Sequence, residues 1–301
     1  MPRLEGVYAP IPTPFTPSSD LDWEALKLNL EFWNSFPLAG YVVLGSNGEA
    51  VHLREPEKLA LIDRVRQNAP EERQVIAGTG LFSTTETSAL TRSAAEAGAG
   101  AALVLPPFYF RGQMTNDVLA RHFRTVADES PIPVIVYNMP ANTALDMPAP
   151  LLAQLSEHEN IAGLKDSSGN IAKLSELRQG AAPGFALLAG SAGFFLPALA
   201  AGADGGVLAL ANIAPQICLE ILALSRGGDW ERARSLQARI ARANRAVTRQ
   251  WGVPALKAAM DLIGLSGGLP RPPLIALAEG NRRELQTILT EAGIPAAKET
   301  E

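Results

Sequence analysis

Eight short apolar runs recur along this chain of 301 residues, and most of them are separated by segments with a helical pattern. The runs are rich in Val, Leu, Ile and Ala and do not alternate cleanly with polar residues, as expected for parallel strands that are buried on both faces. Eight strand–helix units over roughly 210 residues fit an α/β fold of the (β/α)8, or TIM, barrel type. Right-handed crossovers let such a series close on itself. The runs lie at residues 6–11, 40–45, 74–79, 101–106, 133–137, 161–165, 185–189 and 206–210.

An open, doubly wound sheet is the main alternative architecture. Its usual mark is a dinucleotide-binding fingerprint with three glycines. The segment at residues 78–83 has glycine at positions 78 and 80 and lacks the third. The sequence therefore favours the closed barrel.

Helical patterns lie between the apolar runs. Leu59, Ile62 and Val65 fall on one helical face, and so do the residues at positions 118, 119, 122, 123 and 126. Ser83 and Glu86 have the spacing of a capping box at the start of a helix. These patterns predict amphipathic helices between the strands.

From about Pro215 onward the sequence shows helical patterns only. We expect residues 1–214 to form the catalytic barrel and residues 215–301 to form a helical region packed on it. Further helices are expected at residues 229–250, 254–263 and 281–292. The first of these carries six arginines, which we interpret as a solvated or subunit-facing surface because the whole chain is acidic.

The formal net charge of −5 and the isoelectric point near 5.4 argue against a general nucleic-acid binder, which would normally have a basic surface. The single cysteine, Cys218, excludes an intrachain disulfide framework and fits a reducing cytosol. The N-terminal segment beginning at Met1 does not read as a signal peptide, and no apolar run reaches the ~18 residues of a membrane span. We therefore expect a cytoplasmic protein without a membrane or nucleic-acid partner.

Lys165 is the most informative single residue, because it ends an apolar run that reads as a buried strand. Burial disfavours the charged form of lysine, and the neutral amine can form a Schiff base with a carbonyl substrate. A lysine that extends its head out of the strand end is the alternative interpretation. In a (β/α)8 barrel, however, the active site lies at the carboxyl ends of the strands. The strand ends gather Thr13, Ser46, Asn47, Glu49, Thr79, Tyr109, Tyr137, Asn138, Lys165, Asp166, Ser167, Gly190, Ser191 and Asn212.

Other groups at these strand ends allow more than one interpretation. Tyr137 could be a core tyrosine, but beside a lysine on the next strand it is a candidate for proton transfer. The segment at residues 45–49 contains an Asn-Gly turn signal, and its hydroxyl, amide and N–H groups could also hold a carboxylate. We expect Glu49 to cap or orient the next helix. The glycines at 190 and 193 follow the seventh strand, where many barrels bind phosphate, so a phosphosugar substrate stays open.

Metal and serine-hydrolase chemistry are disfavoured. His52, His122 and His158 fall on expected loops or helices, and no ligand cluster has zinc spacing. No nucleophile elbow pairs with a histidine at a strand end. We expect neither a metal ion nor an organic cofactor.

Three motifs resemble those of the dihydrodipicolinate synthase / N-acetylneuraminate lyase family. They are Gly45-Ser46-Asn47-Gly48-Glu49, Tyr137-Asn138-Met139-Pro140 and Gly163-Leu164-Lys165-Asp166-Ser167, and the likeness covers residues 5–273. The resemblance implies a class I pyruvate aldolase on a (β/α)8 barrel, commonly a tetramer built as a dimer of dimers. Lys165 would be the Schiff-base lysine, Tyr137 the proton shuttle, and Tyr109 a relay tyrosine contributed across a subunit interface.

Within that family the chain resembles 4-hydroxy-2-oxoglutarate aldolases. Ser46 and Asn47 stand where the synthases usually have two threonines, and Asn142 stands where they have an arginine. The resemblance implies that Ser46 and Asn47 hold the pyruvyl carboxylate and that Ser167 and Asn142 contact the distal part of the substrate. It also places Gly190 and Val207 in the substrate site. Two departures, Ala144 for glycine and a single tyrosine within residues 108–110, remove no catalytic group.

The expected reaction is the cleavage of 4-hydroxy-2-oxoglutarate to pyruvate and glyoxylate. The alternatives are condensation of pyruvate with aspartate semialdehyde, as in 4-hydroxy-tetrahydrodipicolinate synthase, and cleavage of another 2-oxo-3-deoxy sugar acid. A non-catalytic barrel that acts as a sensor or scaffold is the alternative from another class, because fold alone does not imply function.

Overall fold

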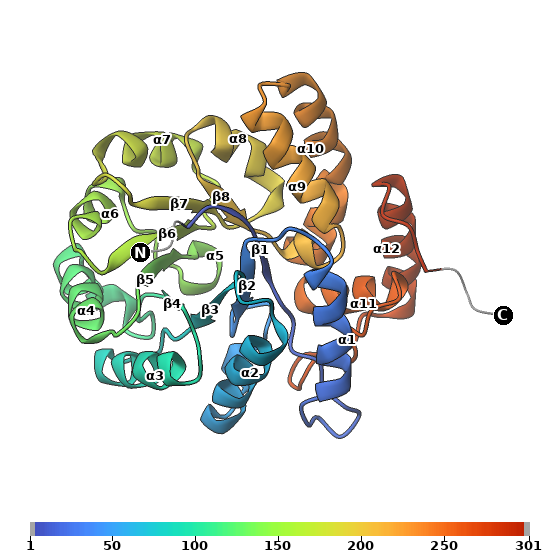
Figure 1. The fold of residues 1–301 in the computed structure, drawn as a ribbon, viewed down its shortest axis with the longest axis horizontal. Coiled ribbons are helices and arrows are strands. Elements are labelled where there is room, and N and C mark those ends of the chain that lie inside the picture. The colour runs from blue at the N-terminus through green and yellow to red at the C-terminus, as the bar shows by residue number, and fades with distance from the viewer. Residues whose placement is uncertain (1–3, 298–301) are drawn as a thin grey trace.

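The computed structural model describes residues 4–297, and its eight strands close into a parallel barrel (Figure 1). Each strand pairs with the next, and β8 pairs with β1 to complete the ring. The predicted (β/α)8 fold is therefore confirmed. The strands are β1 (Gly6–Pro10), β2 (Gly40–Val43), β3 (Gln74–Gly78), β4 (Ala101–Val104), β5 (Val134–Asn138), β6 (Ile161–Asp166), β7 (Ala186–Ala189) and β8 (Gly205–Val207).

Residues 1–3 and 298–301 lie outside the described residues. The expectation of no signal peptide rests partly on Met1, Pro2 and Arg3, so the structure does not address it. Among the described helices, none combines the length and the apolar character needed to cross a membrane.

The eighth strand is shorter than predicted. It ends at Val207, the Leu208 N–H donates to the Tyr8 carbonyl at 3.0 Å, and Ala209–Asn212 forms a 3₁₀ turn. The Asn212 side-chain amide donates to the carbonyl of Pro10 and so holds this turn against β1. The prediction that this strand runs to residue 210 was wrong because an apolar run does not distinguish a strand from a buried turn.

The apolar core has two layers. The barrel interior is filled by side chains that include Tyr8, Val42, Ile76, Ile135, Tyr137, Leu188 and Val207, and a larger layer lies between the strands and the helices. Successive strand residues point to opposite faces. Leu164 belongs to the outer layer, so the next residue on β6, Lys165, points into the barrel.

Helices surround the barrel between consecutive strands (Figure 1). Their bounds are α1 (Trp23–Asn34), α2 (Glu55–Asn68), α3 (Thr84–Glu96), α4 (Asn116–Glu129), α5 (Pro140–Thr143), α6 (Ala149–Ser156), α7 (Ile171–Gly180) and α8 (Phe195–Ala200). The predicted cap of α3 is present, because Ser83 Oγ accepts from the Glu86 N–H at 3.1 Å. Val118 was expected to share the apolar face of α4 and is instead 40% exposed. It lies one residue, about 100° of helical rotation, from Leu119 and so falls at the edge of the buried stripe.

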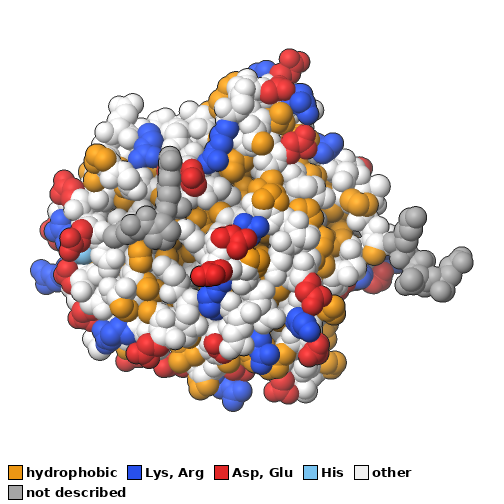
Figure 2. Space-filling model, in the orientation of Figure 1, with side chains coloured by type: hydrophobic (Ala, Val, Ile, Leu, Met, Phe, Trp, Pro, Cys, Tyr) orange, Lys and Arg blue, Asp and Glu red, His pale blue; other side chains and the backbone are white. Residues whose placement is uncertain are grey.

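The C-terminal helices gather on one side of the barrel, next to α1 and α8 (Figure 1). They are α9 (Pro215–Arg226), α10 (Trp230–Arg245), α11 (Gly252–Leu262) and α12 (Glu279–Glu291), with a π-helical turn, Ala246–Gln250, after α10. The arginines of this α10 segment are exposed. On the face shown in Figure 2, acidic and basic side chains are mixed with apolar ones rather than separated by sign.

Candidate active site

A cavity of about 340 Å³ opens at the carboxyl ends of the barrel strands. Ser46, Tyr137 and Asn142, all predicted site residues, line it. Lys58 of α2 also lines it, and burial lowers the pKa of this lysine. Sequence reasoning did not identify Lys58, because on a helical pattern it looks like any solvated lysine.

Lys165 and Tyr137 lie side by side within the barrel. They are register partners on the adjacent strands β6 and β5, and each side chain is buried. The Lys165 Nζ atom lies 3.9 Å from the centroid of the Tyr137 ring. A cation over an aromatic face is stabilised by the ring quadrupole without a neutralising carboxylate.

Lys165 differs from the other buried lysines of the described chain. The ammonium of Lys173 pairs with Asp166 at 2.8 Å and with Asp146 at 2.6 Å, and that of Lys257 pairs with Glu49 at 2.8 Å. Among the described residues, Lys165 has no carboxylate within ion-pair distance. It is therefore the buried amine that is free to react, since the other two are held by acidic partners.

The Tyr137 hydroxyl is more acidic than an ordinary phenol. Burial alone would raise its pKa, but the positive charge of Lys165 and interactions with Ser46, Lys165 and Ser167 outweigh that effect and lower the pKa. A lowered phenol pKa eases the transfer of a proton from the hydroxyl at neutral pH.

A polar network fixes the strand ends that carry this pair. Asn138 follows the tyrosine and donates to Asp146 at 2.7 Å and to Asp166 at 2.9 Å, and Asp166 follows the lysine. The buried Lys173 of α7 joins both carboxylates. The contribution of Lys173 was missed, because helical spacing alone does not reveal which face carries a buried charge.

Two non-glycine residues in the left-handed region flank residues 45–48. Leu44 has φ 61° and Glu49 has φ 53°. Thr13 Oγ1 donates to the Gly48 carbonyl at 2.6 Å. The loop leaves Ser46 exposed at the cavity, so its hydroxyl can donate to an anion there, whereas Asn47 is half-buried and is not part of the cavity wall.

Glu49 does not cap a helix, contrary to expectation. Its side chain makes no capping hydrogen bond to the following 3₁₀ turn, Ala50–His52. Its carboxylate faces the C-terminal region instead, where Lys257 of α11 and the Arg271 N–H meet it at 2.8 and 2.9 Å. The carboxylate also contacts His52 Nδ1 of that turn at 3.2 Å, so Glu49 is joined to the turn without capping it.

Ser167 and Gly190 are packed against each other at the ends of β6 and β7. The Ser167 Oγ atom is buried, and its contact with the Tyr137 hydroxyl helps to lower the pKa of that tyrosine. A Cβ atom at Gly190 would lie 2.0 Å from this oxygen. The Gly190 N–H already donates to the Asp166 carbonyl at 2.7 Å, so glycine there provides space for the Ser167 hydroxyl. Val207, on β8, lies in the barrel-interior cluster with Tyr137.

Polar groups of residues 190–193, the glycine loop after β7, are hydrogen-bonded within the protein. Ser191 Oγ accepts from the Gly193 N–H at 3.2 Å and from the Asn244 side-chain amide at 3.1 Å. These donors are therefore turned inward rather than toward a phosphate.

Tyr109 is not brought into the cavity of its own chain. It is 73% exposed, and its ring contacts Phe82 and Phe110 with centroids 6.0 and 5.0 Å away. Phe82 also contacts Phe108 at 5.1 Å, and both of these rings line the cavity. The exposed rings of Phe82, Tyr109 and Phe110 form an aromatic rim beside the cavity mouth.

The remaining candidate chemistry groups lie outside the cavity. His52 contacts Glu49, His122 contacts Thr84 and His158 contacts Asp128. Within residues 4–297, no group of three or more His, Cys, Asp and Glu side chains could hold a metal ion. Cys218 is buried in α9, and burial raises its pKa to about 12.

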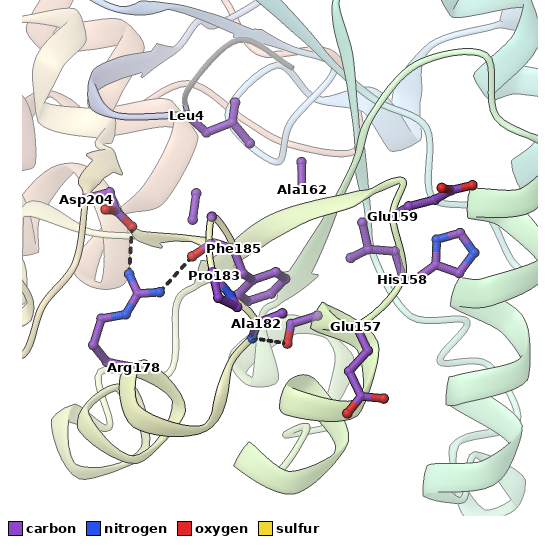
Figure 3. Close-up of a pocket in the computed structure, with 14 residues that line it drawn as sticks. Leu4, Glu157, His158, Glu159, Ala162, Arg178, Ala182, Pro183, Phe185 and Asp204 are labelled. Carbon is purple, nitrogen blue, oxygen red and sulfur yellow. Dashed lines mark hydrogen bonds and ion pairs between the residues drawn. The ribbon is translucent and has the colours of Figure 1, made fainter.

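A larger hollow of about 710 Å³ lies at the opposite end of the barrel, where β6 and β7 begin (Figure 3). Several of its polar groups are already paired. Arg178 donates to Asp204 at 3.2 Å and to the Phe185 carbonyl at 2.9 Å, and the Ala182 N–H donates to Ser156. Size alone does not make it the active site, because the buried lysine–tyrosine pair lies at the other end.

Comparison with known proteins identifies the family of the chain. The sequence matches the Dihydrodipicolinate synthetase family over residues 3–292. The structure is similar to that of dihydrodipicolinate synthase from Aquifex aeolicus, with a TM-score of 0.92 and 30% identity over 98% of this chain and 100% of that one.

Curated relatives include both aldolases and synthases. A probable mitochondrial 4-hydroxy-2-oxoglutarate aldolase of Emericella nidulans is 37% identical over 97% of this chain and 96% of its own. A 4-hydroxy-tetrahydrodipicolinate synthase of Methanococcoides burtonii is 35% identical over 96% of this chain and 99% of its own. The L-threo-3-deoxy-hexylosonate aldolase of Hypocrea jecorina is 34% identical over 95% of each chain. With these matches over almost its full length, the chain is a lyase of the aldolase class and belongs to the dihydrodipicolinate synthetase family.

Proposed function

We propose that this chain is a Schiff-base-forming, pyruvate-dependent aldolase that cleaves 4-hydroxy-2-oxoglutarate to pyruvate and glyoxylate. The observation that carries the proposal is Lys165, a buried amine without a carboxylate partner that lies 3.9 Å from the Tyr137 ring centroid. A nucleophile beside a proton-transfer group is the arrangement that covalent catalysis on a carbonyl needs.

The reaction follows from these two side chains. The Lys165 amine attacks the C2 carbonyl of the 2-oxoacid, water leaves, and a protonated imine forms. The imine withdraws electrons as the C3–C4 bond breaks and the C4 hydroxyl gives up its proton, so glyoxylate departs and an enamine of pyruvate remains. Protonation at C3 and hydrolysis by water then release pyruvate and the free lysine. Tyr137 carries the protons between these groups.

The cavity walls support binding of the pyruvyl carboxylate by the loop of Ser46 and Asn47. Charge-assisted hydrogen bonds from such donors are short and strong, and they orient the C2 carbonyl toward the lysine. Asn142 lines the same cavity, and Ser167 directly follows β6, the strand that carries Lys165. Both are assigned to the distal part of the substrate, with Gly190 and Val207 shaping the barrel interior around it.

The nearest rival substrate is aspartate semialdehyde, since relatives at 35% identity are named 4-hydroxy-tetrahydrodipicolinate synthases. Asn142 argues against it by resemblance, because it stands where the synthases usually have an arginine. The energy of a charged hydrogen bond, about 1.5–3 kcal/mol, does not separate the two substrates, since 4-hydroxy-2-oxoglutarate also has a distal carboxylate. Lys58 is a cation on the cavity wall that is available to such a carboxylate. Another 2-oxo-3-deoxy sugar acid is the third candidate.

A second copy of this chain is the proposed partner. The aromatic rim consists of Phe82, Tyr109 and Phe110, which are 61%, 73% and 64% exposed. Contiguous exposed aromatics are typical of an interface. A symmetric contact through the rim would place Tyr109 of each subunit at the cavity of its neighbour. We propose a dimer of this kind as the minimal active unit and a tetramer of two such dimers.

The substrate is tested by comparing kcat/KM for three reactions. They are cleavage of 4-hydroxy-2-oxoglutarate, condensation of pyruvate with aspartate semialdehyde, and cleavage of 2-oxo-3-deoxy sugar acids. We expect the first to be fastest, because kcat/KM ratios report differential transition-state binding. If the semialdehyde reaction is fastest, the interpretation of Asn142 is wrong and the protein is a synthase.

The nucleophile is tested by borohydride reduction in the presence of pyruvate. Mass spectrometry of the digested protein should find a reduced pyruvyl group on Lys165 and on neither Lys173 nor Lys257, which serve as internal controls. Lys165→Ala should abolish both the modification and turnover, because the other fully buried lysines of the described residues are paired with carboxylates and Lys58 lies on the outer wall of the cavity, on α2. Full activity in Lys165→Ala would refute the mechanism.

The proton shuttle is tested by Tyr137→Phe, which should lower kcat by about 10²–10⁴-fold because a positioned acid–base group is lost. Tyr8→Phe is a matched control. Tyr8 is also a buried tyrosine of the barrel interior, but its hydroxyl donates to Gln74 at 2.8 Å, at the start of β3 and away from the cavity. A Tyr137→Phe enzyme that retains more than about a tenth of wild-type kcat would contradict the assignment.

The shared site is tested by mixing two inactive variants, Lys165→Ala and Tyr109→Phe, and measuring activity after subunit exchange. If Tyr109 acts in the neighbouring subunit, a mixed dimer contains one intact site and activity returns. If it acts in its own subunit, no mixed dimer has an intact site. Sedimentation of each variant confirms that both still assemble, and an active wild-type monomer at assay concentration would overturn the proposal.

A further inference from the structure

A buried ion pair joins the loop at residues 45–49 to the C-terminal helices. Lys257 of α11 is fully buried and Glu49 is 2% exposed, and their Nζ and Oε1 atoms lie 2.8 Å apart. No step of the proposed reaction uses either group. A buried pair of this kind is often no more stabilising than apolar residues of the same size, so its place beside the site calls for another explanation.

The pair is embedded in a set of specific contacts. The Lys257 ammonium also donates to the Leu269 carbonyl at 2.9 Å and lies 4.5 Å from the centroid of the Phe15 ring. The second oxygen of Glu49 accepts from the Arg271 N–H at 2.9 Å and contacts His52 Nδ1 at 3.2 Å. Every polar contact to the Glu49 side chain therefore comes from the C-terminal region or from the turn that follows the loop.

Arg271, which contacts Glu49 through its backbone N–H, has its own carboxylate partner. The Arg271 guanidinium binds both oxygens of Glu57 on α2, at 2.8 and 2.9 Å, and lies 4.4 Å from the centroid of the Phe15 ring. Hydrogen bonding to Arg271 outweighs the effect of burial and lowers the pKa of Glu57 to about 2. Lys257 thus sits in a region whose charges are matched, and only Glu49 faces it as a carboxylate at ion-pair distance among the described residues.

The loop that Glu49 terminates is held in an unfavourable backbone conformation. Leu44 and Glu49, which bracket residues 45–48, both have positive φ. Non-glycine residues adopt this conformation only where surrounding contacts enforce it, and they cluster at functional sites. Inside the bracket, the Gly48 N–H donates to the Gly45 carbonyl at 3.0 Å and the Glu49 N–H to the Ser46 carbonyl at 3.2 Å. The shape of residues 45–48 therefore depends on the backbone conformation of Glu49, whose side chain is held by Lys257.

We propose that Glu49 and Lys257 are positioning residues that hold the loop at residues 45–49 in the shape that binds the pyruvyl carboxylate. This inference rests on the proposed function, because it assigns the loop to that carboxylate. Lys257 pulls the Glu49 side chain toward α11, the left-handed turn at Glu49 follows, and Ser46 is presented to the cavity with Asn47 next to it. The C-terminal helices thereby act on substrate binding without contacting the substrate.

Substrate binding by the loop and imine formation at Lys165 depend on different contacts. Loss of the pair relaxes the loop and weakens capture of the carboxylate. The strand ends that carry Lys165 and Tyr137 stay in place because they are held by the separate network of Asp166 and Lys173, and the loop reaches them only through the contact of Ser46 with the Tyr137 hydroxyl. The affinity for pyruvate should therefore fall while imine formation at saturation persists. A pair that only stabilises the fold would lower the melting temperature without this split.

The test uses the full-length protein and the dependence of borohydride trapping at Lys165 on pyruvate concentration. In Glu49→Gln and in Lys257→Met, the half-saturating pyruvate concentration should rise by about tenfold to a hundredfold, the range expected for one lost charge-assisted hydrogen bond. The trapped fraction at saturation should stay near the wild-type value. Because the two residues act as a unit, the half-saturating pyruvate concentration of the double variant should be no higher than that of the more impaired single variant.

Asp204→Asn is the matched control. It breaks the Arg178–Asp204 pair, which spans 3.2 Å at the other end of the barrel (Figure 3). It should lower the melting temperature and leave the half-saturating pyruvate concentration unchanged. Glu49→Asp and Lys257→Arg keep the charges and should restore part of the affinity. They also replace the first variants if those do not fold.

The outcomes distinguish the two proposals. A wild-type protein that pyruvate and borohydride do not modify overturns the proposed function. A modified wild type whose folded Glu49 and Lys257 variants keep the wild-type half-saturating concentration overturns only the positioning role. In kinetics with the full substrate, the same variants should raise KM much more than they lower kcat, and an equal loss in both would also contradict the proposal.

Discussion

The pairing of β8 with β1 brings eight strand ends, far apart in the sequence, to one rim. The closure depends on close backbone approach, since a Cβ atom at Gly205 would lie 2.0 Å from the Gly6 carbonyl oxygen. In an open sheet the first and last strands would be separated, and the loops after β1 and β8 could not face the residues of β5 and β6. The cavity, the lysine–tyrosine pair and the contact between the C-terminal helices and the loop at residues 45–49 all depend on this ring.

Three buried lysines illustrate how burial is matched to role. Lys173 and Lys257 have carboxylate partners, and each joins segments that are distant in sequence. Lys165 has an aromatic ring in place of a carboxylate. A buried ammonium is costly unless it is compensated, so two lysines serve as fixed structural charges and the third is available for chemistry. The same neighbour, Tyr137, gains acidity from this contact.

The family assignment and the site geometry constrain the reaction more strongly than the substrate. Lys165, Tyr137 and the loop at residues 45–49 lie on strands or directly after them, where the barrel holds them. Asn142 and Lys58 lie on the first helices outside the strands, and relatives with different named activities match this chain at 34–37% identity. Substrate choice in barrels resides in such loops and short helices, which vary while the strands are retained.

Pattern and motif in the sequence were enough to predict the closed parallel barrel, the positions of its strands and the pairing of Lys165 with Tyr137 at one rim. These features follow from local periodicity and from the rule that places strand ends together. Only the tertiary structure decided the partner of Glu49, the ion pairs of Lys173 and Lys257, the end of β8 at Val207 and the outward position of Tyr109. Each of these depends on contacts between segments far apart along the chain, and such contacts have no local signature, because a charge on a helix looks the same in sequence whether its partner is water or a buried carboxylate.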